Sequence, residues 1–268
     1  MVLEFAKMNG AGNDFVLIDN RSRTIRLSRE QIARLCDRHR GIGADGLMLL
    51  VPSGGKADWA WEFYNSDGST GEMCGNGARC FARFVRRKAG AAERITFETE
   101  AGVIAAKFDG ARVTVNLTPP EGLRLNEQVA LAEGPITVHS LNTGVPHAIL
   151  FVPDADQAMV ERLGPQVRRH PHFAPKGTNV DFVQVLAPGM IRVRTFERGV
   201  EGETLACGTG VAASALVASR VHRFGAPVKV HVQSGDELEV GFAERSGGFA
   251  EVTLTGPAEY VFEGRIEL

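Results

Sequence analysis

Two of the four cysteines occur in the same local pattern, in which glycine, one variable residue and a second glycine follow the thiol. The copies occupy residues 74–77 and 207–210, and each precedes a segment of helical character. Glycine permits a tight turn and a close approach to the backbone. At a helix start, unpaired amides and the helix dipole favour negative charge. We therefore expect each thiol to have a lowered pKa, and the amides beside it to hold a carboxylate.

Two such thiols can do what one side chain cannot. A thiolate can remove the proton from one face of an amino acid's α-carbon, and a thiol can return a proton to the other face. Amides that hold the carboxylate would stabilise the charge that develops. The duplication predicts that Cys74 and Cys207 face each other across a cleft. Cys36 and Cys80 lie in apolar helical stretches and are predicted to be packing residues.

An internal repeat organises the chain. Asn13-Asp-Phe-Val16 is matched by Asn179-Val-Asp-Phe-Val183, and the two cysteine turns follow in the same order. Helices are expected at residues 78–88 and 211–221, and the second is apolar or small nearly all round, so it must be buried on every side. A turn at Thr118-Pro-Pro-Glu-Gly122 is the expected linker between the halves.

The remaining elements are short. Residues 28–39 begin with a capping box and have helical apolar spacing. Residues 105–108 and 112–117 predict a hairpin with a type I′ turn around Asp109-Gly110, and residues 238–242 and 250–254 flank a turn built on Ser246. Many strands and few long helices predict an α+β fold with curved, mostly antiparallel sheet.

Composition excludes several classes of protein. The 268 residues are 44% hydrophobic and 23% charged, which is typical of a packed core, and the net charge of −2 gives no basic surplus for nucleic acid or an anionic membrane. The first ten residues lack the apolar segment of a signal peptide, and the apolar run at 47–51 is too short to span a bilayer. We expect a cytoplasmic protein with reduced thiols.

Three further patterns have ordinary explanations. Residues 41–46 match a dinucleotide-binding pattern literally, but they follow a helix and precede a strand, which is the reverse of the required order. His170 and His172 resemble a metal pair without partner ligands, and the cysteine spacing does not fit zinc, so no metal site is expected. The basic residues of the helix after Cys74 are interpreted as a solvated face; they are Arg79, Arg83, Arg86, Arg87 and Lys88.

Several longer motifs occur in a fixed order along the whole chain. They occupy residues 7–15, 40–45, 65–69, 74–80, 179–180, 197–199, 203–210 and 256–258, with Gly264 near the end. In these motifs the chain resembles the diaminopimelate epimerase family. The resemblance implies two pseudo-symmetric domains, residues 1–118 with 257–268 and residues 119–256, each a mixed, mostly antiparallel sheet rolled into a barrel around a central helix.

The resemblance also implies an activity. Members interconvert LL- and meso-2,6-diaminoheptanedioate in lysine and peptidoglycan precursor biosynthesis, as homodimers and without a cofactor. By position, Cys74 and Cys207 would be the catalytic pair. The implied substrate-binding residues are Asn13, Asn65, Gly75, Asn76, Asn179, Glu197, Arg198, Gly208 and Thr209.

Within this set, the amides of Gly75, Asn76, Gly208 and Thr209 would hold the reacting carboxylate, and Asn13 would contact the reacting amino group. Asn65, Asn179 and Arg198 would bind the distal carboxylate, Glu197 the ammonium groups, and His147 with Glu197 would tune a thiol pKa. The chain departs from some members at Gly46 and Val145, where a polar substrate contact is lost.

Other interpretations remain open at the level of sequence. A proline-racemase-like epimerase or a related isomerase could share the fold, although proline has no distal carboxylate for Arg198 to bind. A non-catalytic amino-acid-binding or thiol-redox protein is a different class, but redox cysteines normally lie close together in the chain. Taken singly, the asparagines could be turn formers, Glu197 and Arg198 a surface ion pair, and His147 a loop histidine.

Overall fold

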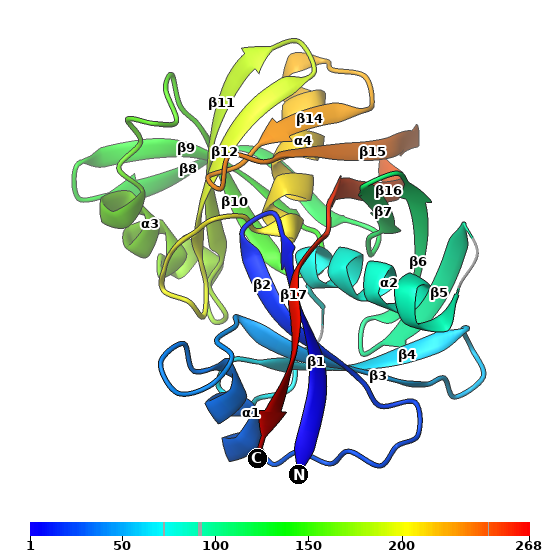
Figure 1. The fold of residues 1–268 in the computed structure, drawn as a ribbon. Coiled ribbons are helices and arrows are strands. Elements are labelled where there is room, and N and C mark those ends of the chain that lie inside the picture. Colours follow the sequence, from blue (N-terminus) through cyan, green and yellow to red (C-terminus); the bar gives the residue numbers. More distant parts are fainter. Residues whose placement is uncertain (72, 91–92, 246) are drawn as a thin grey trace. The chain divides into compact units, whose positions relative to one another are not determined.

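The computed structural model describes residues 1–71, 73–90, 93–245 and 247–268 (Figure 1). The turn predicted at Ser246 therefore lies outside the described residues. The chain divides into two compact units, Met1–Asn116 with Gly256–Leu268, and Leu117–Thr255. The domain boundaries expected from sequence are placed after residues 118 and 256. The segment 118–122 is not only a linker, because a strand begins at Glu121.

The first unit contains a mixed sheet and two helices. Its strands are β1 (Val2–Gly10), β2 (Asn13–Asp19), β3 (Gly46–Pro52), β4 (Trp59–Asn65), β5 (Arg94–Thr99), β6 (Gly102–Asp109), β7 (Arg112–Asn116) and β17 (Glu259–Glu267). Its helices are α1 (Arg29–Cys36) and α2 (Gly75–Ala89). The return strand β17 lies antiparallel to β1, so the two chain ends are side by side in Figure 1.

The second unit repeats this composition. Its strands are β8 (Glu121–Leu131), β9 (Gly134–Asn142), β10 (Pro146–Phe151), β11 (Asn179–Ala187), β12 (Met190–Glu197), β13 (Gly202–Thr204), β14 (Val228–His231), β15 (Glu237–Arg245) and β16 (Gly248–Pro257). Its helices are α3 (Val160–Arg168), the short 3₁₀ helix η1 (Pro171–Phe173) and α4 (Gly208–His222).

The order of strand pairings is the same in the two units. In the first unit, β1 to β7 pair in chain order, and only β2–β3 and β4–β5 are parallel. In the second, β9, β10, β11, β12, β14, β15 and β16 pair in that order, and only β10–β11 and β12–β14 are parallel. Along the chain, each parallel pair of strands is connected through a helix: α1 and α2 in the first unit, α3 and α4 in the second. The predicted mixed, mostly antiparallel α+β fold is confirmed.

The longest helix of each unit packs against strands from both ends of its sheet. Helix α2 contacts β1, β2, β3, β6 and β7, and α4 contacts β9, β10, β11, β12, β14 and β15. Each sheet therefore curves around its helix. Helix α4 is buried from Gly210 through Ser219, as its small and apolar sequence predicts, but Val221 at the end of the predicted range is 37% exposed. Helix α2 exposes only the basic residues of its last turn, where they complement the helix dipole.

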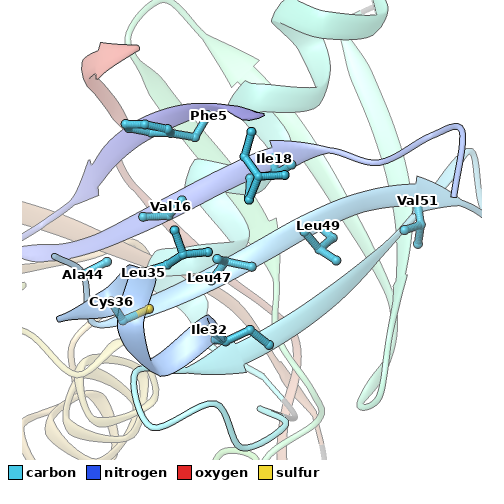
Figure 2. Packing of buried hydrophobic residues seen from close by; sticks show 11 residues of the cluster. Phe5, Val16, Ile18, Ile32, Leu35, Cys36, Ala44, Leu47, Leu49 and Val51 are labelled. Carbon is cyan, nitrogen blue, oxygen red and sulfur yellow. The ribbon is translucent and has the colours of Figure 1, made fainter. Parts of the chain in front are cut away.

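Helix α1 packs against the first sheet through Ile32, Leu35 and Cys36, which form a buried cluster with residues of β1, β2 and β3. Ser28 caps it through the predicted capping box, and the helix ends at Cys36, earlier than the predicted residue 39. Figure 2 shows Cys36 packed among Leu35, Ala44 and Leu47 in a cluster of buried apolar residues. A thiol in this position behaves as a small apolar side chain. The packing role predicted for Cys36 is confirmed, and Cys80, which has no exposed surface, has the same role.

Two details of the sequence interpretation are wrong. The repeated Asn-Asp-Phe-Val motifs do not occupy equivalent strands, because the first lies in β2 and the second in β11, whose counterpart by strand order is β3. The β6–β7 turn is centred on Gly110 and Ala111, and only Gly110 has a positive φ. A type I′ turn requires positive φ at both central residues, so the turn is of another type.

In the part of the chain that the structure describes, no helix is both long and apolar enough to cross a membrane.

Candidate functional site

Cys74 is the N-cap of α2. Its extended backbone leads directly into the helix, and its sulfur accepts a hydrogen bond from the amide of Gly77 at 3.4 Å. Cys74 is partly exposed, whereas Gly75, Asn76 and Gly77 behind it are buried. The helix start thus places a partly exposed cysteine next to the first amides of the helix, which have no carbonyl partner within the helix.

Glycine at residue 10 allows this helix start to pack against β1. A Cβ atom at Gly10 would lie 2.8 Å from the carbonyl oxygen of Asn76 and 3.0 Å from the sulfur of Cys80. Both distances are shorter than ordinary contacts, and the first involves backbone that cannot move independently. The absence of a side chain at residue 10 therefore fixes how closely the cysteine turn approaches the sheet.

Asn13 and Asn76, both predicted to bind substrate, are in direct contact. The carboxamide nitrogen of Asn76 donates to Oδ1 of Asn13 at 2.6 Å, and Asn13 donates to Oδ2 of Asp45 at 3.0 Å. At the other end, Nη2 of Arg79 donates to Oδ1 of Asn76 at 2.9 Å. Arg79 has no exposed surface, so the prediction that it belongs to a solvated basic face is wrong. Its position one turn into α2 faces the core, unlike Arg86 and Arg87.

Charged groups hold the far end of this hydrogen-bonded chain. Arg38 donates to Oδ1 of Asp45 and to both oxygens of Asp14, each at 2.8 Å. Lys7 is also paired with Asp14, at 2.8 Å, and donates to the carbonyl of Gly43. Burial alone would raise the pKa of Asp14, but the hydrogen bonds and charges of Arg38 and Lys7 outweigh it and lower the pKa to about 2.

Asn65 lies apart from this chain, at the end of β4. Its side chain donates to Oγ of Ser69 at 3.0 Å, and its backbone closes the turn through residues 65–69. Asn65 pairs with Gly46 across the sheet. A Cβ atom at Gly46 would lie 2.7 Å from the carbonyl of Tyr64 and 2.8 Å from the ring of Phe63. The departure at Gly46 is therefore enforced by packing, since a longer side chain has no room there.

Cys207 is the N-cap of α4, in the second unit. It is 7% exposed, and its sulfur lies 3.4 Å from Oγ1 of Thr209. Burial, followed by the negative charges of Glu197 and Asp181, raises the pKa of the Cys207 thiol well above its ordinary value. The expected lowering is wrong for this thiol, because desolvation and two carboxylates outweigh the helix start. The negative charge of Glu197 thus favours the protonated form of the Cys207 thiol.

A buried polar chain continues from Thr209. Nε2 of His147 lies 3.0 Å from Oγ1 of Thr209, and Nδ1 lies 2.7 Å from Oδ2 of Asp181. An ionised carboxylate can only accept, so Nδ1 carries the hydrogen and Nε2 is free to accept from the threonine hydroxyl. The hydroxyl oxygen can in turn accept from the Cys207 thiol. The chain thereby connects the sulfur to a buried histidine and aspartate.

Sequence interpretation missed Asp181. It has no exposed surface, and it also accepts a hydrogen bond from Thr195 at 2.7 Å. A Cβ atom at Gly210 would lie 2.5 Å from Oδ1 of Asp181, so the second glycine of the cysteine turn makes room for this carboxylate. The available signal was the spacing of Asn179 and Asp181, because residues two apart in a strand point to the same face.

Asn179 joins the remaining predicted residues of this unit. Its Oδ1 accepts from the backbone amide of Arg198 at 2.7 Å, and its nitrogen lies 3.4 Å from Nε2 of His147. The guanidinium of Arg198 donates to the carbonyl of Lys176 at 3.4 Å. Glu197, the last residue of β12, precedes Arg198. Thus Asn179, His147, Glu197, Cys207 and Thr209 gather within one unit.

The patterns given ordinary explanations are found in structural positions. Ile42 and Gly43 donate to the carbonyl of Leu35 in the last turn of α1, and Gly41 donates to that of the C-cap residue Asp37, so the segment that matches the dinucleotide pattern closes the end of a helix. His170 and His172 bond to Ala130 and Glu127. Within the described residues, no group of three or more His, Cys, Asp or Glu side chains is arranged to hold a metal ion.

Comparison with known sequences gives a consistent result. The family model described as diaminopimelate epimerase matches residues 5–122 and 139–261. A diaminopimelate epimerase of Aquifex aeolicus is 44% identical over 279 residues, covering 98% of this chain and 98% of the relative. One from Hydrogenobaculum is 42% identical and covers 97% of each chain.

Solved structures with low sequence identity share the fold. A phenazine biosynthesis protein of the PhzF family from Bacillus anthracis superposes with a TM-score of 0.75 at 15% identity, with full coverage of both chains. A probable proline racemase from Agrobacterium radiobacter superposes with a TM-score of 0.74 at 19% identity, covering 99% of this chain and 93% of the other. At these identities the likeness concerns the fold alone.

Proposed function

The chain belongs to the diaminopimelate epimerase family, and on this premise we propose that Cys74 and Cys207 are the base and acid that interconvert LL- and meso-2,6-diaminoheptanedioate. The enzyme is an isomerase. The observation that carries the assignment of roles is the contrast between the thiols: Cys74 is accessible at a helix start, whereas Cys207 is buried next to two carboxylates that favour its protonated form.

The proposed reaction moves one proton at each face of the α-carbon. The Cys74 thiolate takes the α-proton, and the electron pair left on carbon delocalises into the substrate carboxylate. Amides at the starts of α2 and α4 hold that carboxylate and stabilise the added charge. The Cys207 thiol then donates its proton to the opposite face, which leaves Cys74 protonated and Cys207 as thiolate. The reverse reaction begins from that state.

The polar chain behind Cys207 fits the acid role. Thr209 lies between the sulfur and Nε2 of His147, and Asp181 holds the histidine tautomer in which Nε2 accepts. When Cys207 has given up its proton, the threonine hydroxyl can turn and donate to the thiolate. The chain thus stabilises both protonation states of the sulfur without a change of backbone.

The polar residues of each unit account for a substrate with two amino-acid ends. Asn13 offers its carbonyl oxygen to the reacting ammonium group. Arg198, whose backbone amide Asn179 fixes, offers a guanidinium that can bind the distal carboxylate bidentately. Glu197 supplies a negative charge for an ammonium group. In the same proposal, Asn65 helps to bind the distal carboxylate. Because the thiols supply acid and base, no cofactor is required.

We further propose a homodimer formed along β1 and β17. Val2, Val261 and Phe262 are 63%, 57% and 48% exposed on these adjacent strands, and a groove of about 1160 Å³ runs beside β1. A second copy would cover the apolar side chains. Light scattering should give twice the chain mass for the wild type and the monomer mass for Val261→Asp, with Glu244→Gln on an exposed strand end as the unchanged control. A wild-type monomer would contradict the proposal.

The cell compartment follows from the chemistry. All four cysteines are free in the structure, and two of them must stay reduced to transfer protons. A reducing cytoplasm satisfies that condition. Fractionation of cells that express the native chain should place it with cytoplasmic markers, and recovery outside the cytoplasm would contradict this part of the proposal.

The substrate assignment is tested by following purified, reduced protein with LL-2,6-diaminoheptanedioate, L-proline and 4-hydroxy-L-proline in parallel, using chiral chromatography. We expect the meso isomer to form from the first compound and no isomer from the others. Arg198→Met should raise KM strongly, because the distal carboxylate loses its charge partner. Turnover of proline instead would support the racemase alternative and overturn the assignment.

A further inference from the structure

Arg79 is the largest side chain in the structure with no exposed surface. It lies on α2, one turn after the catalytic thiol of the proposed mechanism, and it donates hydrogen bonds in three directions. Nη1 donates to the carbonyl of Gly75 at 3.2 Å, Nη2 to Oδ1 of Asn76 at 2.9 Å, and Nε to the carbonyl of Pro257 at 3.2 Å. A cation in such a place is costly to bury and must be well hydrogen-bonded.

The two ends of the hydrogen-bonded chain determine how the asparagines point. A carboxamide can be turned over with little change of shape, so its partners decide where the oxygen lies. Arg79 can only donate, and therefore Oδ1 of Asn76 faces it. The nitrogen of Asn76 then donates to Oδ1 of Asn13, and the nitrogen of Asn13 donates to Asp45, whose carboxylate can only accept. Donation runs in one direction from guanidinium to carboxylate.

The consequence concerns the group that meets the substrate. With its nitrogen committed to Asp45, Asn13 has its carbonyl oxygen on the side of the cysteine turn. That oxygen retains a lone pair beyond the bond from Asn76. An ammonium group is a donor and needs such an acceptor. If Asn76 turned over, its oxygen would face the oxygen of Asn13, and the order of the chain would be lost.

We propose that Arg79 is a positioning residue that fixes the carboxamide of Asn76 and, through it, the acceptor oxygen of Asn13 that receives the reacting ammonium group. The proposal rests on the proposed function for the identity of that ammonium group. Arg79 itself is enclosed and does not touch substrate. The planar fork of arginine reaches the Gly75 carbonyl and the Asn76 side chain together, a geometry that the single ammonium of lysine does not reproduce.

The competing explanation is purely structural, because Arg79 also ties the return segment at Pro257 to α2. Helix α2 offers a matched control. Arg83, one turn further on, donates to the carbonyls of Gly110 and Ala111 and thereby also ties the helix to another element. Within the described residues, Arg83 makes no hydrogen bond to Asn13 or Asn76. Arg83→Met therefore removes a structural tie alone.

The first experiment compares kcat/KM for the wild type, Arg79→Lys, Arg79→Met and Arg83→Met, each checked for folding by circular dichroism. We expect kcat/KM to fall roughly 100-fold in Arg79→Met, since small misplacement of a binding group has effects of that size. In Arg79→Lys, kcat/KM should fall by a smaller factor. This variant replaces Arg79→Met in the comparison if the Met variant does not fold. Arg83→Met should lose stability and keep its kcat/KM. Equal kinetics for the Arg79 and Arg83 variants would overturn the proposal.

A double-mutant cycle separates positioning from general damage. If Arg79 acts through Asn13, then Arg79→Lys should change kcat/KM by no more than about twofold in an Asn13→Ala background, because the group it positions is gone. A structural role predicts the same loss in both backgrounds. Multiplying losses would therefore count against the proposal.

A measurement that does not depend on catalytic activity tests the positioning role of Arg79 separately from the proposed function. The side-chain carboxamide signals of Asn13 and Asn76 can be followed by ¹⁵N NMR and assigned through Asn13→Ala and Asn76→Ala. Both signals should shift in the Arg79 variants and stay in place in Arg83→Met. An unmoved Asn13 signal overturns the positioning role even if the enzyme is active, whereas a wild type inactive on diaminoheptanedioate with shifted signals would overturn only the function.

Discussion

Cys74 and Cys207 begin two helices with the same turn of residues, yet their surroundings differ. Cys74 is partly exposed, whereas Cys207 is buried near the carboxylates of Glu197 and Asp181. A shared sequence pattern therefore supplies two thiols of different character. That difference suits one base and one acid, and it arises from side chains outside the pattern.

Thiol accessibility gives a direct prediction. Native protein treated with iodoacetamide at pH 8 should be alkylated first at Cys74. Burial raises the pKa of Cys36 and of Cys80 to about 12, so both remain protonated and shielded at that pH. Peptide mass spectrometry before and after denaturation measures the order. Modification of Cys80 ahead of Cys74 in folded protein would contradict the description of the site.

Asp181→Asn should lower kcat by roughly 100-fold or more with a smaller effect on KM. An asparagine can donate to Nδ1 of His147 and so favour the tautomer whose Nε2 no longer accepts from Thr209; comparable tautomer changes have large effects on rate. Steady-state kinetics measure the change. Asp154→Asn, an exposed aspartate, is the control. An unchanged kcat in folded Asp181→Asn would show that the chain behind Cys207 is not used.

Among the secondary-structure elements, the two central helices differ in the side chains that they bury. Helix α4 is built mainly from small and apolar residues and is buried from Gly210 through Ser219, whereas Val221 and His222 in its last turn are exposed. Helix α2 keeps a basic last turn in solvent and buries its first turns, including Arg79. In both helices the cysteine turn is the end that approaches polar residues of the sheet, because glycines allow the backbone to come close.

Gly10→Ala tests this close approach. The added methyl group would meet the Asn76 carbonyl and the Cys80 sulfur, so α2 must shift away from β1. Overpacking of this kind destabilises proteins by about 1–3 kcal/mol, and here it should also lower kcat because the turn at Cys74 moves. Denaturant unfolding and kinetics measure the two effects. Gly202→Ala has open space around its added methyl and is the matched control; an equal response of both variants would contradict the prediction.

At the scale of the whole chain, the repeat was visible in sequence through the cysteine turns, because glycines and a following helix form a local pattern. The matching order of parallel and antiparallel strand pairs could not be predicted from the sequence, since strand order depends on contacts between distant segments. The Asn-Asp-Phe-Val likeness even suggested the wrong equivalence. The cysteine turns repeat at the helix starts and the strand order repeats around them, whereas the Asn-Asp-Phe-Val motifs lie on strands that do not correspond.

The same limit explains which site residues sequence reasoning found. The cysteines and glycines of the site could be identified from their spacing in the sequence. Arg79 and Asp181 were misjudged or missed, because whether a charged side chain is buried depends on what the fold places around it. Gly46 departs from the family pattern for a packing reason that only the neighbouring strand reveals. The sequence pattern thus located the two thiols that we propose to react, and three-dimensional contacts showed which side chains surround them.

Acid stability should depend on Asp14, which connects β2 to Lys7 and Arg38. Its pKa in the folded protein, about 2, is below the ordinary 3.8, so its stabilising effect is complete above pH 4 and is lost as pH falls from about 4 to about 2. Urea unfolding across this range measures it. Asp14→Asn should be less stable at neutral pH and show a flatter dependence, unlike the exposed control Asp109→Asn. Equal slopes for wild type and Asp14→Asn would contradict this assignment.

In the proposed mechanism, two thiols act on opposite faces of one carbon. Initial turnover of LL-2,6-diaminoheptanedioate in deuterated water, with NMR detection of the α-position, tests this for wild type, Cys74→Ala and Cys207→Ala. We expect deuterium in the newly formed meso product with little in the remaining substrate, and loss of epimerisation in both variants. Product that retains the substrate's own hydrogen, or epimerisation that survives loss of either thiol, would contradict it.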